Sequence, residues 1–150
     1  MKILWLDDMR NPRQYLSAKK NTDTFIRNKN FYDGLMNKTN IDFVWVKSFD
    51  EFCNYIIKNG LPEFVSFDHD LGKGLPKGLD CAKWLVEYCR KHKINLPKFY
   101  VHSANPNGQR EINALLNRNV RETKTNIVTI TETELYEIIK ESVKNILTSL

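Results

Sequence analysis

The sequence of 150 residues is poor in the residue types that mark specialised classes of protein. Its three cysteines, six glycines and five prolines exclude a disulfide-rich scaffold, a collagen-like repeat and a proline-rich linker. No apolar run approaches the roughly 20 residues of a membrane-spanning helix. The first residues, MKILWLDD, lack the long apolar region of a signal peptide. We therefore expect a soluble, cytoplasmic protein with no membrane partner.

The cysteines and the charges say little about function. Cys53, Cys81 and Cys89 show no CxxC spacing, so we interpret them as core thiols in a reducing compartment. The net charge is +5, and the lysines are scattered along the chain rather than gathered in a basic block. A solvated, lysine-rich surface explains this charge, and its modest positive field favours phosphate-bearing ligands.

Apolar runs of strand length alternate with segments of helical periodicity. The strand-like runs are KILWL (2–6), IDFVWV (41–46), EFVSF (63–67) and KFYVH (98–102). The predicted helices are residues 48–60, 79–93 and 108–119. Ser48 and Glu51 form a capping box at the start of the first helix. This alternation predicts a Rossmann-like α/β sandwich, in which helices cover both faces of a mostly parallel sheet.

Two regions fit this scheme less well. Residues 13–40 are polar and rich in Lys and Asn, and we interpret them as a helix or as an inserted lid. Residues 121–130, RETKTNIVTI, are a candidate fifth strand with a short apolar part. The α/β domain is therefore expected to span residues 1–126.

Residues 127–150 are predicted to form a C-terminal amphipathic helix. Thr131 and Glu134 form a capping box, and apolar residues recur at helical spacing from Leu135 to Leu150. The helix either packs on the sheet as the last element of the domain or, through residues 130–150, serves in docking or self-association.

Polar side chains gather where three predicted strands end. The carboxyl ends of parallel strands lie at one edge of the sheet, where open α/β sheets bind their ligands. We therefore expect one site at this edge. Its residues are Asp7, Asp8 and Arg10 after the first strand, Asp68, His69 and Asp70 after the third, and His102, Ser103 and Asn105 after the fourth.

The carboxylates in this group predict a metal site. Buried carboxylates repel one another unless a cation neutralises them. Oxygen-rich clusters suit Mg²⁺ or Mn²⁺, which complete their coordination with water and phosphate. The expected metal ligands are Asp7, Asp8, Asp68 and Asp70. Strand alternation places His69 on the opposite face from Asp68 and Asp70.

The motifs resemble those of known families. LWLDD at the end of the first strand, Asp68 and the pair Ser103-Ala104 look like the receiver domains of two-component response regulators. More specifically, LDDMRNP, SFDHDLG, GLD (78–80) and VHSANPNGQREI resemble the cyclic-phosphate-processing receiver-like family, called cREC. The match runs across residues 1–118, apart from the long segment 13–40.

The resemblance implies a receiver-like three-layer sandwich that holds Mg²⁺ at its acidic edge. On that match, Asp7 and Asp8 are the acidic pair and Asp68 is an acceptor-like residue. The sequence departs from true receivers where a lysine closes the fifth strand. Lys124 is the only candidate there, and no proline follows it.

Phosphodiester hydrolysis gives each remaining candidate a role. The reaction requires charge neutralisation on the phosphate oxygens, an activated nucleophile and an acid for the leaving alkoxide. The expected catalytic residues are His69 and His102, as an acid–base pair, together with Asp68. The expected phosphate-binding residues are Arg10, Ser103, Asn105 and Arg110.

Structural roles are the alternatives for three of these residues. His69 could pack under the sheet, and His102 could only orient a neighbouring carboxylate. Arg10 could pair with a carboxylate, Asp7 or Asp70, instead of with substrate.

Two functions remain open. The first is a metal-dependent phosphoesterase acting on a cyclic nucleotide, a cyclic oligonucleotide signal or an RNA end with a 2′,3′-cyclic phosphate. If the chain is phage-encoded, the enzyme would destroy a cyclic-nucleotide immune signal in the host cytoplasm as counter-defence. The second is a non-catalytic receiver-like module that binds a phosphate ligand or accepts phosphate at Asp68. The histidines beside the acids and the missing Lys-Pro favour the first.

Overall fold

The computed structural model describes residues 1–19 and 41–125. Residues 1–120 form one compact unit. The described elements are, in chain order, β1 (Lys2–Leu6), α1 (Pro12–Lys19), β2 (Asp42–Val46), α4 (Phe49–Asn59), β3 (Phe64–Phe67), α5 (Gly78–His92), β4 (Lys98–Val101) and α6 (Pro106–Thr125).

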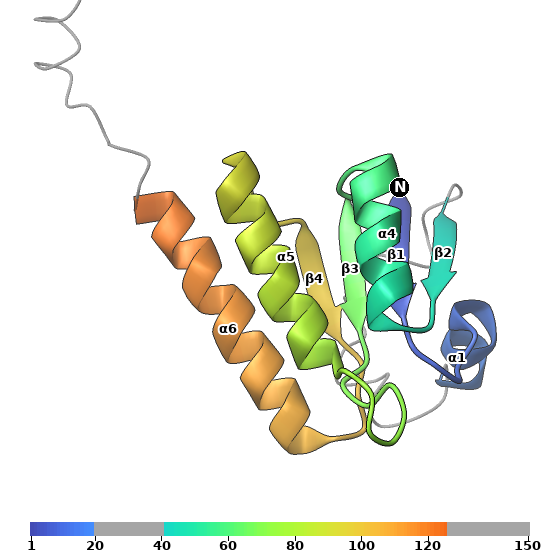
Figure 1. Ribbon diagram of the computed structural model, residues 1–150. Coiled ribbons are helices and arrows are strands. Elements are labelled where there is room, and N and C mark those ends of the chain that lie inside the picture. Colours follow the sequence, from blue (N-terminus) through green and yellow to red (C-terminus); the bar gives the residue numbers. More distant parts are fainter. Residues whose placement is uncertain (20–40, 126–150) are drawn as a thin grey trace, which may run out of the picture. The chain divides into compact units, whose positions relative to one another are not determined.

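The four strands form one parallel sheet with the order β2-β1-β3-β4. Figure 1 shows α4, α5 and α6 side by side over one face of this sheet. On the other face, the ring of Tyr15 in α1 lies 5.4 Å from the ring of Trp5 in β1. Helices therefore contact both faces, and the predicted receiver-like α/β sandwich is confirmed.

The prediction of a fifth strand is wrong for residues 121–125, because these residues belong to α6. No glycine or proline interrupts residues 109–125, so nothing in the sequence ends the helix earlier. Three expectations fall wholly or partly outside the described residues. They are the second half of the candidate fifth strand (126–130), residues 20–40 of the expected helix or lid, and the expected C-terminal helix (127–150).

The main core lies between the sheet and helices α4 to α6. Strand alternation turns Leu4, Leu6 and Phe67 to this face, where each is fully buried. Each such side chain contributes roughly 1.5–3 kcal/mol by leaving water. Helix α4 begins as predicted, with the Ser48 hydroxyl accepting a hydrogen bond from the backbone amide of Glu51.

The cysteines are core thiols, as expected. All three are free and buried, and burial raises the pKa of the Cys53 and Cys89 thiols to about 11. They are therefore protonated near neutral pH and unsuited to nucleophilic chemistry. Across the described residues, no helix combines the length and the apolarity that a membrane crossing requires.

Candidate active site

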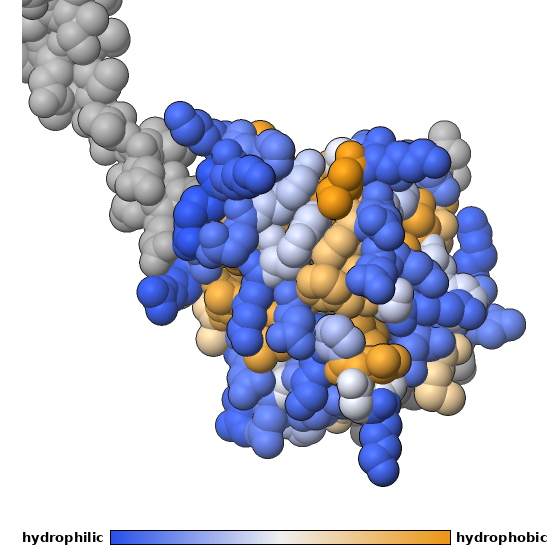
Figure 2. All heavy atoms as spheres, viewed as in Figure 1, coloured by the Kyte–Doolittle hydropathy of each residue, from blue (hydrophilic) through white to orange (hydrophobic). Residues whose placement is uncertain are grey.

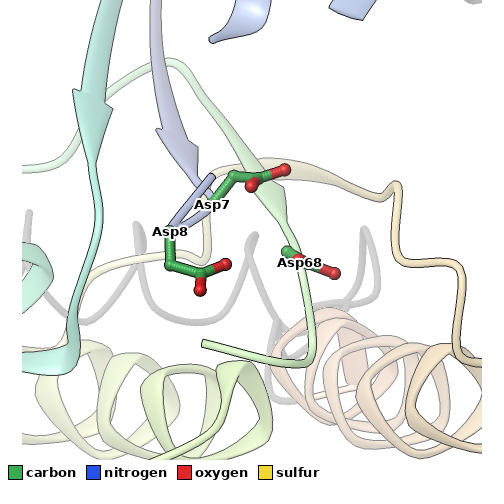
Figure 3. A group of neighbouring side chains, drawn as sticks. All are labelled: Asp7, Asp8 and Asp68. Atoms are coloured by element: carbon green, nitrogen blue, oxygen red, sulfur yellow. The ribbon is translucent and has the colours of Figure 1, made fainter. Parts of the chain in front are cut away.

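Three carboxylates meet at the carboxyl edge of the sheet. Asp7 and Asp8 follow β1 and Asp68 follows β3 (Figure 3). Each offers an oxygen atom, and these oxygens lie within 4.8 Å of one another. Asp7 is 0% and Asp68 is 4% exposed, so their negative charges require partners inside the protein.

Arg10 is the partner that bridges two of the carboxylates. Its Nε donates to Oδ2 of Asp7 at 2.7 Å, and its Nη2 donates to Oδ2 of Asp68 at 2.6 Å. The backbone amides of Met9 and Arg10 donate to the other oxygen of Asp7, at 3.0 and 2.7 Å. The turn after β1 therefore wraps around Asp7 and brings the guanidinium between the strand ends.

The pKa values show how charge is distributed in this group. Burial opposes ionisation of Asp7, but the hydrogen bonds from His102 and from the amides of Arg10 and Met9 outweigh it, so the pKa of Asp7 is lowered. Burial and the neighbouring charges of Asp7 and Asp68 raise the pKa of Asp8. Three carboxylates with one guanidinium carry −3 + 1 = −2, which matches the charge of one divalent cation.

His102 lies behind Asp7 and away from solvent. Its Nε2 donates to Oδ2 of Asp7 at 3.1 Å, and its Nδ1 accepts a hydrogen bond from the Ser66 hydroxyl at 2.8 Å. This assignment follows from a neutral imidazole placed between a carboxylate and a hydroxyl. Burial lowers the pKa of His102, and its ring stacks on Trp5 with centroids 4.0 Å apart. His102 therefore holds the Asp7 side chain in position from the interior of the protein.

Ser66 was not among the residues expected in the site. It lies two positions before Asp68 in β3 and is 1% exposed, so it shares the strand face of Asp68. That alternation is the signal that could have revealed it, since a hydroxyl inside an apolar strand requires a hydrogen-bond partner.

His69 turns to the opposite face, as strand alternation predicts. Its Nδ1 donates to Oδ1 of Asp70 at 2.9 Å, and Asn105 donates to the other Asp70 oxygen at 3.2 Å. The imidazole packs directly on Gly108 of α6, where a Cβ atom would lie 2.2 Å from Cγ of His69. The structure therefore requires glycine at position 108 to admit the buried imidazole.

The structure brings together three of the four expected metal ligands. Asp70 lies outside the group of Asp7, Asp8 and Asp68, and its carboxylate is engaged by His69 and Asn105 instead. The chain turns after Asp68, so Asp70 does not join the other three carboxylates, and its role as a metal ligand stays a prediction. The alternative roles described above fit both histidines, and direct proton transfer to substrate stays a prediction.

The other expected phosphate-binding residues shape the start of α6. The Ser103 hydroxyl accepts from the backbone amide of Asn105 at 3.2 Å, and the Asn105 side-chain oxygen accepts from the amide of Gly108 at 3.1 Å. Arg110 donates to the side chain of Asn107. Of the four expected phosphate-binding residues, Arg10 is the only one that lines the cleft beside the carboxylates.

An open cleft of about 680 Å³ lies beside the carboxylates. Its size is within the usual range of ligand sites, roughly 300–1,000 Å³. One wall comes from the strand ends and the other from the loop between β3 and α5. The lining residues are Asp8, Met9, Arg10, Asp68, Asp70, Gly72, Lys73, Gly74, Leu75 and Lys77.

Gly78 positions the acidic group, and replacing it should damage the site. A Cβ atom there would lie 1.8 Å from the backbone oxygen of Asp68, so Gly78→Ala must displace the chain at Asp68. We expect a loss of about 3 kcal/mol in the free energy of unfolding, at the upper end of ordinary overpacking, together with weaker Mn²⁺ binding. Urea unfolding and calorimetry measure the two effects.

Gly60→Ala is the matched control for this substitution. Gly60, unlike Gly78, has a positive φ, +80°, and a Cβ atom there meets nothing within 4 Å. We expect Gly60→Ala to lose about 1–3 kcal/mol from backbone strain, with unchanged Mn²⁺ affinity. Unchanged Mn²⁺ affinity in Gly78→Ala as well would mean that close packing at Asp68 does not position the acidic group.

One comparison with known proteins identifies a family. A family model described as the cyclic-phosphate processing receiver domain matches residues 2–118. No curated protein matches the chain. Among solved structures, one similar chain is a fusion that contains the yeast Spc42 trimeric coiled coil, amino acids 181–211. It is 15% identical, the alignment covers 99% of this chain and 94% of that chain, and the TM-score is 0.44, so the likeness carries no conclusion.

The family match covers most of the described residues. It includes the acidic ends of β1 and β3, the cleft loop and most of α6. The sequence motifs that resemble the family lie in these same elements. The chain belongs to the family of cyclic-phosphate processing receiver domains.

Proposed function

We propose that the chain is a metal-dependent phosphoesterase that hydrolyses cyclic phosphates. The observation that carries this proposal is the group of Asp7, Asp8 and Asp68, which keeps a net charge of −2 after pairing with Arg10. Two of its members, Asp8 and Asp68, line a ligand-sized cleft. The family description supports the substrate class.

The donor set fits Mg²⁺ or Mn²⁺. Both ions prefer carboxylate oxygens and tolerate sites built from a few of them, and Asp7, Asp8 and Asp68 supply oxygens within 4.8 Å of one another. The raised pKa of Asp8, which burial and like charge produce, reflects negative charge that a divalent cation would offset. When bound, the ion supplies Lewis-acid stabilisation of negative charge on the phosphate.

Arg10 is the residue of the chain best placed to bind a phosphate oxygen. A guanidinium has five N–H donors, and bonds to Asp7 and Asp68 use two of them, which leaves three. The side chain is 33% exposed and lines the cleft. Its orientation is fixed by the two carboxylates, as electrostatic preorganisation requires.

Asp70 is the candidate proton acceptor at the cleft wall. Its side chain is 61% exposed, and the hydrogen bond from His69 lowers its pKa and keeps it ionised. In hydrolysis, the oxygen of water bonds to phosphorus as one ring ester bond breaks, and the leaving oxygen takes a proton from solvent in the open cleft. Asp70 would accept the proton of the attacking water, with His69 acting as a positioning residue behind it.

Chelation and Asp8→Asn test this function. We expect the wild-type protein to hydrolyse at least one of a 2′,3′-cyclic nucleotide, a 3′,5′-cyclic nucleotide and a cyclic oligonucleotide with Mn²⁺ or Mg²⁺ and to lose that activity in EDTA. Asp8 is the most exposed of the three acids, so Asp8→Asn keeps the fold. It should weaken Mn²⁺ binding by roughly 10- to 100-fold, the loss typical of a damaged metal site.

Asp50→Asn on the exposed surface of α4 is the matched control and should change neither quantity. Full activity in EDTA would exclude a metal-dependent reaction. A stable acyl phosphate on Asp68 after treatment with acetyl phosphate, without any hydrolysis of the cyclic substrates, would favour the receiver-like binding module instead.

A further inference from the structure

The loop between β3 and α5 forms a prebuilt wall of the cleft. Its start is anchored by Leu71, which is 3% exposed, and its end by Gly78, whose amide donates to the carbonyl of His69 at 2.8 Å. Between them, Gly72 and Gly74 adopt positive φ values of 112° and 75°, a region that L side chains rarely adopt. The two ends of the loop are therefore fixed beside the carboxylates, and the exposed residues 72–77 lie between them.

Two lysines on this loop line the cleft, and the charge of Lys77 helps to lower the pKa of the nearby Asp70 carboxyl. Lys73 and Lys77 both line it, and among the described residues neither ammonium forms an ion pair. The charge of Arg10, in contrast, is already matched by Asp7 and Asp68. With Asp70 counted, Lys73 and Lys77 leave this end of the cleft with a net charge of +2 − 1 = +1, which favours a second anion.

Exposed apolar side chains lie in the same cleft. The described residues include four exposed large hydrophobic side chains, and two of them, Met9 at 80% and Leu75 at 57%, line this cleft. Figure 2 shows hydrophobic atoms among hydrophilic ones where Figure 1 draws the loop between β3 and α5. An apolar surface beside positive charge suits a flat aromatic group that carries phosphate, as a nucleobase does in a nucleotide.

We propose that the cleft binds a nucleotide with a second phosphate besides the one at the acidic group. Lys73 and Lys77 contact this second phosphate, and Met9 and Leu75 contact the base. The proposal rests on the proposed function for the position of the first phosphate. It narrows the substrate class to cyclic phosphates with a further 5′-terminal or internucleotide phosphate, and it disfavours a mononucleotide with a single cyclic phosphate.

Calorimetric binding of reaction products tests the second phosphate without requiring turnover. The probes are adenosine 3′-monophosphate, adenosine 3′,5′-bisphosphate and an adenosine dinucleotide with a 3′-phosphate, each with Mn²⁺. We expect the wild-type protein to bind at least one of the latter two about tenfold more tightly than the monophosphate, as one or two charge-assisted contacts provide. Which of the two binds tightly distinguishes a terminal from an internucleotide phosphate.

Variants assign this preference to the loop. Lys73→Ala with Lys77→Ala should reduce the tenfold ratio to about one and leave the affinity for the monophosphate almost unchanged. Lys58→Ala with Lys91→Ala is the matched control, because both lysines are exposed and lie in the last turns of α4 and α5. Leu75→Ser should weaken the binding of all three nucleotides by a similar factor, so the ratio of their affinities should not change.

The results separate this inference from the proposed function. Equal affinity for one and two phosphates, or a preference that survives the double lysine substitution, would overturn the second-phosphate site even if cyclic phosphates are hydrolysed. A lysine-dependent preference without hydrolysis of any cyclic phosphate would support the site and count against the hydrolase.

Discussion

An Arg10→Ala variant is expected to hydrolyse cyclic phosphates about 10²–10³-fold more slowly than the wild-type protein, the loss typical of removing one transition-state donor. At the same time it should bind Mn²⁺ more tightly. Removing the guanidinium changes the charge of the acidic group from −2 to −3 (−3 + 1 against −3). Turnover and metal affinity should therefore change in opposite directions.

The stability of this variant should depend on the metal. Without Mn²⁺, the buried carboxylates of Asp7 and Asp68 lose the cation that pairs with both, and we expect a lower melting temperature than in the wild-type protein. A ligand that binds only the folded state restores stability in proportion to its affinity. Mn²⁺ should therefore raise the melting temperature of Arg10→Ala by more than it raises that of the wild-type protein.

Arg10→Lys separates charge from geometry. Lysine keeps the single positive charge, so Mn²⁺ affinity should stay near the wild-type value. The lysine ammonium cannot reproduce the planar guanidinium, which donates to Asp7 and Asp68 at the same time, so turnover should still fall. If Arg10→Ala weakened Mn²⁺ binding, the guanidinium would be supporting the metal site, and the charge argument would be wrong.

The sequence predicted the position of the acidic group well, because strand ends follow from short-range patterns. Alternating apolar runs placed Asp7, Asp8 and Asp68 after β1 and β3, and parallel topology brought the two ends to one edge. Alternation also predicted that His69 turns away from Asp68. Helix α4 and its cap follow from local residues for the same reason.

Side-chain partners across several strands could not be predicted in this way. His102 reaches Asp7 past the intervening strand β3, where Ser66 holds its other nitrogen. The pattern of each strand contains no information about the order of strands in the sheet, on which this contact depends. Asp70 shows a related limit, since regular alternation places it beside Asp68, whereas the strand ends at Phe67 and the Asp70 carboxylate contacts His69 and Asn105.

The lysines of the cleft were missed for another reason. Lys73 and Lys77 lie in a segment whose glycines and proline identify it only as a loop. Its place beside the carboxylates comes from tertiary anchors at Leu71 and Gly78, which local sequence does not reveal. Scattered lysines are therefore informative only after the fold places some of them beside a site.

His102→Ala should have the largest effect on stability of any single substitution considered for this chain. It leaves the fully buried carboxylate of Asp7 without the imidazole donor and the Ser66 hydroxyl without its acceptor. It also opens a cavity where the ring stacks on Trp5. We expect the free energy of unfolding to fall by about 3–5 kcal/mol, the range for breaking a buried charged network or emptying a core position.

Ser66→Ala provides a graded comparison by equilibrium unfolding in urea. It removes only the outer hydrogen bond and keeps the imidazole against Asp7, so the loss should be about 1–3 kcal/mol. If His102 acts by positioning Asp7, His102→Ala should weaken Mn²⁺ binding clearly and Ser66→Ala only slightly. Unchanged Mn²⁺ affinity in a folded His102→Ala variant would show that Asp7 is held by Arg10 and the backbone amides alone, because those contacts are the only others that the described residues make to its carboxylate.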